Sequence, residues 1–146
     1  MLFLVQCILT GYLTGLIWFV QIVHYPLFKH VDEAHFPEYH HQHTRRTFWA
    51  AGLPMVFELA AAVVLFGMDA PRDAGRAVWL TWTAGNLLTV LLLWLVTLTL
   101  QAPQHGRLSK NWSCELHHRL VRGNWIRTAL WSFRSLWLVV GGTWLA

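Results

Sequence analysis

The chain has 146 residues, of which 55% are hydrophobic and only 12% are charged, and its formal net charge is +4 at pH 7. A soluble domain carries roughly a quarter charged residues, so this composition excludes an ordinary soluble protein and indicates a membrane protein. The basic residues gather in two connections between apolar runs, a placement typical of membrane topology and not of a nucleic-acid-binding surface.

Four apolar runs approach the roughly 20 residues that cross a hydrocarbon core, at about 2–24, 47–68, 77–102 and 124–145. Backbone groups in lipid must form hydrogen bonds within their own segment, so these runs are predicted to be helices. With short polar extensions, the predicted helices cover about 2–24, 40–68, 77–102 and 114–145. We therefore predict an all-α, integral membrane four-helix bundle that forms a single transmembrane domain, 1–146.

Prolines and glycines predict where these helices end. Tyr25 and Pro26 are expected to end the first helix, because a residue that precedes proline disfavours the helical conformation. Pro103 and Gly106 are expected to end the third helix, and Gly123 is a candidate break in the fourth.

The two long connections predict the orientation. They hold most of the basic residues, namely Lys29, Arg45, Arg46, Arg107, Lys110, Arg119 and Arg122. In the short connection, Arg72 and Arg76 are offset by Asp69 and Asp73. The positive-inside rule places both long connections in the cytoplasm and both termini on the non-cytoplasmic side, in a bacterial inner (plasma) membrane.

The two halves of the chain repeat one interval. Glu38 follows Pro26 by 12 residues, and Glu115 follows Pro103 by 12 residues. The repeat predicts two parallel two-helix units about an axis along the membrane normal, as in some transporters. Chance matching in a biased composition is the alternative.

All nine histidines lie on the predicted cytoplasmic side, and histidine is the commonest metal ligand. His40 and His43 share a helix face with Glu58, because 18 residues from His40 make five turns at about 3.6 residues each. The first candidate set of metal ligands is His24, His40 and His43 with His117 or His118.

The second candidate set is two Glu-x-x-His pairs, formed by Glu38 with His41 and by Glu115 with His118. This spacing resembles that of ferritin-like di-iron bundles, although the two further glutamates of those bundles have no counterpart here. The two sets differ by about 100° in helix phase and are therefore alternatives. A solvated histidine face near lipid headgroups is the third interpretation.

A second group of polar residues is predicted at mid-membrane. Glu58 and Arg134 lie at matching depths, with Asn86 nearby, and an unpaired charge there costs at least about 2.5 kcal/mol. We expect Glu58 and Arg134 to touch. Arg127 would extend this polar cavity towards the cytoplasm.

These features predict a metal-dependent membrane enzyme, most simply an oxidoreductase. Its cofactor would be a transition metal (iron, copper or zinc) or a haem, and its partners the bilayer and a lipophilic substrate that reaches the site between helices. The alternatives are a metal- or proton-coupled transporter and a non-catalytic membrane subunit that binds a cytoplasmic partner. Gly11 and Gly15 form a small-residue pair of the kind that packs helices closely, so a homo-oligomer is a further expectation. No nucleic-acid partner is expected.

Overall fold

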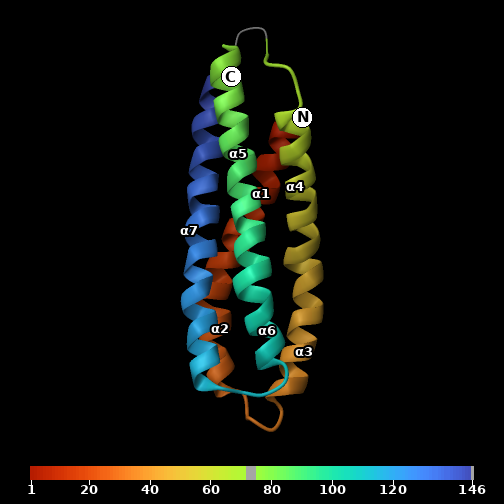
Figure 1. Ribbon diagram of the computed structural model, residues 1–146, viewed down its shortest axis with the longest axis vertical. Helices are drawn as coiled ribbons and strands as arrows, with labels where there is room; N and C mark the ends of the chain where they lie inside the picture. The colour runs from red at the N-terminus through yellow and green to blue at the C-terminus, as the bar shows by residue number, and fades with distance from the viewer. Residues whose placement is uncertain (72–74, 146) are drawn as a thin grey trace.

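The computed structural model describes residues 1–71 and 75–145, and all of the regular structure in these residues is helical. Four long rods run side by side (Figure 1). The first rod consists of α1 (Leu2–Phe19), η1 (Val20–His24), α2 (Tyr25–Leu27) and η2 (Phe28–His30). The second rod consists of α3 (Phe36–Thr47), η3 (Phe48–Gly52) and α4 (Leu53–Phe66), and the third of α5 (Arg76–Val96), η4 (Thr97–Gln101) and α6 (Ala102–Leu108). The fourth rod is α7 (Cys114–Leu145). Arg72 and Asp73, which belong to the short connection used to predict the orientation, lie outside the described residues.

The rods close into a ring, which confirms the predicted all-α four-helix bundle. Helix α1 packs on α4 and α7, and α5 packs on the same two helices. The N-terminus and the end of α7 lie at one end of the bundle, and the two connections that precede α3 and α7 lie at the other (Figure 1). We call the latter the histidine end.

The outside of the bundle is apolar and the inside is partly polar, the reverse of a soluble protein. Exposed side chains include Ile8, Phe57 and Leu95, each more than half exposed. Three helical segments are long and apolar enough to cross a membrane, namely Leu2–His30, Phe36–Phe66 and Arg76–Leu108. These features indicate an integral membrane protein.

The fourth predicted span stays a prediction. Helix α7 covers it, but among the described residues α7 does not reach the apolar character of the other three rods. The reason is that α7 contributes many of the polar groups of the interior, including Asn124, Arg127, Thr128 and Arg134.

The predicted helix ends at Pro26 and Pro103 are wrong. Both rods remain helical past these prolines, to His30 and Leu108. Helix α7 likewise runs unbroken through Gly123. A Cβ atom at Gly123 would lie 3.0 Å from Nε2 of Gln101, so this glycine allows the third rod to approach α7 and does not break the helix.

Three prolines are tolerated because a wide π-helical turn precedes each of them. The turns η1, η3 and η4 each end two residues before a proline, at Pro26, Pro54 and Pro103. Proline has no N–H group and its ring clashes with the carbonyl four residues earlier, so a wider turn makes room for that carbonyl. Ahead of Pro54 the freed carbonyl belongs to Ala50, and the Tyr12 hydroxyl donates to it at 3.0 Å.

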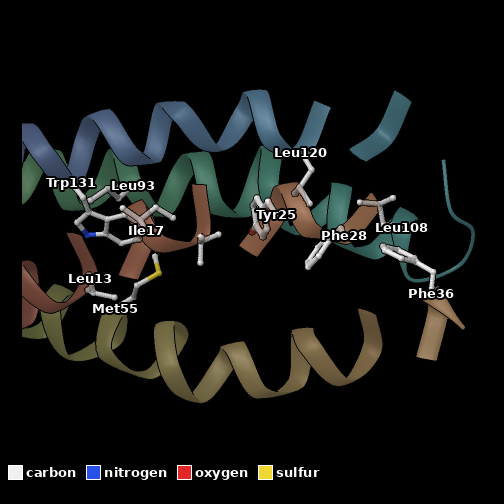
Figure 2. Packing of buried hydrophobic residues seen from close by; sticks show 11 residues of the cluster. Leu13, Ile17, Tyr25, Phe28, Phe36, Met55, Leu93, Leu108, Leu120 and Trp131 are labelled. Carbon is white, nitrogen blue, oxygen red and sulfur yellow. The ribbon is translucent and has the colours of Figure 1, made fainter. Parts of the chain in front are cut away.

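Hydrophobic side chains fill the axis between polar groups. Figure 2 shows Leu13, Met55 and Trp131 at one level and Tyr25 and Phe28 nearer the histidine end. At the opposite end, Trp82 and Trp137 each donate their indole N–H to the other's carbonyl, at 3.2 and 3.1 Å. Gly11 and Gly15 meet nothing within 4 Å, so they do not serve close packing inside the bundle.

Candidate functional site

Four imidazoles from three rods meet at the histidine end. We call His24, His40, His43 and His105 the imidazole cluster. The ring centres of His40, His43 and His105 form a triangle with sides of 5.7, 5.6 and 5.1 Å, and His24 lies 4.7 Å from His43. Phe28 is fully buried beside them, and its ring centre lies 5.1 Å from those of both His24 and His43. This apolar packing restricts water around the cluster.

The cluster is held by hydrogen bonds between ring nitrogens. Nε2 of His24 lies 2.9 Å from Nδ1 of His43, and Nδ1 of His105 lies 3.0 Å from Nε2 of His40. The outer nitrogens of the second pair bond to Tyr25 Oη and Ser109 Oγ, each at 2.8 Å. A neutral imidazole offers one donor and one acceptor, so these contacts form a chain Ser109–His40–His105–Tyr25.

One nitrogen of the cluster has no partner. Nε2 of His43 is buried and accepts or donates no hydrogen bond among the described residues. Buried polar atoms are nearly always bonded, so this ring nitrogen is free to bind a water molecule, an ion or a ligand.

The other histidines of the first candidate set lie apart from this centre. Nε2 of His117 bonds to the carbonyl of Tyr25 at 2.8 Å, and its ring packs on Trp112. His118 is exposed, with Nε2 4.0 Å from Sγ of Cys114.

The structure does not bring the second candidate set together. Glu38, His41 and Glu115 are exposed at the surface. The Glu38 carboxylate accepts a bond from Gln42 at 2.9 Å, and Glu115 forms an ion pair with Arg119. Both contacts are local pairs one turn apart on a helix, which add little stability.

The four imidazole rings lie close together, but their nitrogens are not oriented to hold a metal ion. Among the described residues, no three histidine, cysteine, aspartate or glutamate side chains are arranged to hold a metal ion as they stand. The reason is that nitrogens 2.9–3.0 Å apart point at each other and share a proton. Rings that share a tetrahedral metal at ~2.0–2.1 Å would lie roughly 5 Å apart, which is close to the observed triangle. Rotation of the rings is therefore the main change that binding would require.

A cavity of about 150 Å³ lies next to the cluster, between the first and second rods with α7 as its floor. His24 and His43 line it together with Tyr25, Thr47 and Arg127, and the rest of the wall is apolar. A cavity of this size holds a molecule comparable to benzene. Its apolar wall indicates a lipophilic occupant, and the imidazoles supply polar groups at one side.

The polar layer inside the bundle contains the ion pair that the sequence predicts. Arg134 Nε lies 3.1 Å from Glu58 Oε1, and both side chains are at most 1% exposed. Glu58 also accepts bonds from the Thr10 hydroxyl at 2.8 Å and the Trp131 indole at 3.3 Å. Arg134 donates to the backbone carbonyl of Asn86 at 2.6 Å, while the side-chain amide of Asn86 has no hydrogen-bond partner within residues 1–71 and 75–145.

No protein-family model, curated protein or solved structure matches the chain.

Sequence reasoning missed His105 as a member of the cluster. Local proline rules predict that the helix ends at Pro103, which places His105 in a connection. The available signal was spacing, since Gln101, His105 and Ser109 recur every four residues and so continue one helix face beyond the proline.

Proposed function

We propose that the protein is an integral membrane enzyme whose imidazole cluster binds one transition metal ion beside a cavity for a lipophilic substrate. The observation that carries the proposal is the triangle of ring centres formed by His40, which is fully buried, and by His43 and His105, which are half-buried. In this triangle the Nε2 atom of His43 is buried without a hydrogen-bond partner among the described residues. His40, His43 and His105 would hold the ion, and His24 would supply a fourth nitrogen. Imidazole ligands suit iron, copper and zinc, which supply Lewis-acid or redox chemistry when bound.

A haem is not supported as the cofactor. A cavity of about 150 Å³ is comparable to a benzene-sized site and leaves no room for a macrocycle. The ion would instead lie at the edge of the cavity, where His24 and His43 form part of its wall.

We further propose that the histidine end faces the cytoplasm, as the positive-inside rule requires. Two parallel repeats are supported by one local feature. The first rod of each half carries a π turn two residues before its proline, η1 at Pro26 and η4 at Pro103. The second rods differ, because η3 has no counterpart within α7.

The test is elemental analysis of detergent-purified protein beside the variants His105→Ala and His118→Ala. We expect about one iron, copper or zinc per chain, at least a tenfold loss in His105→Ala, and no loss in His118→Ala, because His118 is exposed and outside the cluster. Circular dichroism would establish that each variant remains helical. Protein that stays metal-free after titration with all three ions would overturn the proposal, as would equal loss in both variants.

A proton-coupled transporter is the second candidate, supported by the hydrogen-bonded chain from Ser109 through His40 and His105 to Tyr25. Such chains of titratable groups inside a membrane can relay protons. Proton flux into liposomes, abolished in His105→Ala and unaffected by chelators, would favour this candidate over the metal enzyme.

A further inference from the structure

We infer that the cavity binds a lipophilic molecule through one small anionic group, such as a carboxylate, which Arg127 holds. This inference deepens the proposed function, on whose site it rests, by naming the chemical class of the substrate. It depends on the geometry around Arg127 and not on the imidazole nitrogens.

Arg127 is a buried cation without a counter-ion. Its side chain is only 7% exposed, and it lines the cavity from α7. Among the described residues no carboxylate forms an ion pair with it, whereas the neighbouring Arg134 is paired with Glu58. Arginine keeps its charge in proteins, so the site carries a permanent positive charge.

The contacts of Arg127 do not neutralise this charge. Its NH1 group donates to Asn124 Oδ1 at 3.3 Å, its NH2 group lies 3.9 Å from the sulfur of Met55, and its guanidinium lies 5.0 Å from the Trp131 ring centre. The Tyr25 hydroxyl is a further hydrogen-bond partner, and it is uncharged. The Nε–H group has no hydrogen-bond partner in the part of the chain that the structure describes. A buried charge without a counter-ion is unfavourable inside a membrane protein, and an anionic ligand would offset that cost.

The size and the lining of the cavity indicate what the apolar part of the ligand looks like. About 150 Å³ accommodates a small head and the first carbons of a chain. Leu16, Phe19 and Ala50 line the wall where the first and second rods face lipid, and Phe19 is 54% exposed. The longer apolar part of the ligand would therefore leave between these rods and lie in the bilayer.

The donor set favours a carboxylate over a neutral or cationic head. A guanidinium presents parallel N–H groups that match the two oxygens of a carboxylate, and Nε–H is one of the groups that remain free. A cationic head would be repelled by Arg127. A neutral head would leave the buried charge as it stands.

The test is equilibrium binding of radiolabelled dodecanoate to the protein in phosphatidylcholine nanodiscs, corrected with empty nanodiscs. Dodecanol and dodecyltrimethylammonium have the same chain with a neutral or a cationic head. We expect saturable binding of one dodecanoate per chain, and at least tenfold weaker binding of the other two. Arg127→Gln should weaken dodecanoate binding at least tenfold. The matched control is Arg122→Gln, which removes the same charge from an exposed position of α7 and should leave binding unchanged.

A second variant guards against misfolding of Arg127→Gln. Ala51 lines the cavity, so Ala51→Leu should fill it and abolish binding with Arg127 intact. Equal binding of dodecanol and dodecanoate, equal loss in both arginine variants, or full binding by Ala51→Leu would overturn the inference.

Metal content measured on the same samples separates the two proposals. Dodecanoate binding by metal-free protein would support the anion site while the metal centre fails. Metal-loaded protein without saturable dodecanoate binding would support the metal centre and contradict the anion site.

Discussion

Replacement of Glu58 by alanine is expected to be one of the most destabilising single changes in the bundle. The substitution leaves the Arg134 guanidinium fully buried without its carboxylate, and it removes the acceptor of the Thr10 and Trp131 donors. Breaking a buried ion pair from one side costs about 3–5 kcal/mol, because the remaining charge stays buried and uncompensated. We expect a loss of about 4 kcal/mol, or roughly a thousandfold in the ratio of folded to unfolded protein at 1.4 kcal/mol per tenfold.

The assay is equilibrium unfolding in mixed micelles with a rising fraction of dodecyl sulfate, followed by circular dichroism. The informative comparison is the double variant Glu58→Met with Arg134→Met, which removes both charges at similar volume. Because apolar replacement of a whole buried pair is often neutral, the double variant should recover at least half of the loss. A loss below about 1 kcal/mol for Glu58→Ala, or a double variant no more stable than the single, would refute the reasoning.

Two further predictions follow from the packing and from the proposed orientation. Gly141→Leu should destabilise the bundle by about 1–3 kcal/mol in the same unfolding assay, because a Cβ atom there overlaps the Trp82 indole; Gly15→Ala, where nothing lies within 4 Å, is the control and should not destabilise. In a Cys7→Ser background, a membrane-impermeant maleimide should label Cys114, which is exposed at the histidine end, in inverted vesicles. Labelling in intact cells instead would place that end outside.

The sequence predicted the features that membrane energetics dictate. Four apolar runs led to four rods, and the high cost of an unpaired charge in lipid led to the contact between Glu58 and Arg134. Helix periodicity placed His40 and Glu58 inward, and both are buried. These arguments need only composition and spacing along one helix.

The features that sequence reasoning missed depend on how rods meet. His105 joins His40 because α6 continues past Pro103, which local proline rules do not predict. The choice between His117 and His118 depended on the rotation of α7 about its axis, and of the two only His117 is buried. The cavity arises where the first and second rods separate beside α7, so no residue pattern within one rod reveals it.

The π turns ahead of three prolines determine where the chain tolerates the deletion of one residue. A wide turn contains one residue more than the regular turn it replaces, and the helix on either side keeps its facing. Loss of one residue within η1, η3 or η4 would therefore leave the side chains beyond it on the same faces, whereas loss of one residue elsewhere in a rod would rotate them by about 100°. In each of these rods, a one-residue deletion is therefore tolerated within the five residues of the π turn. The same deletion elsewhere in the rod would turn the imidazoles or Glu58 out of the bundle.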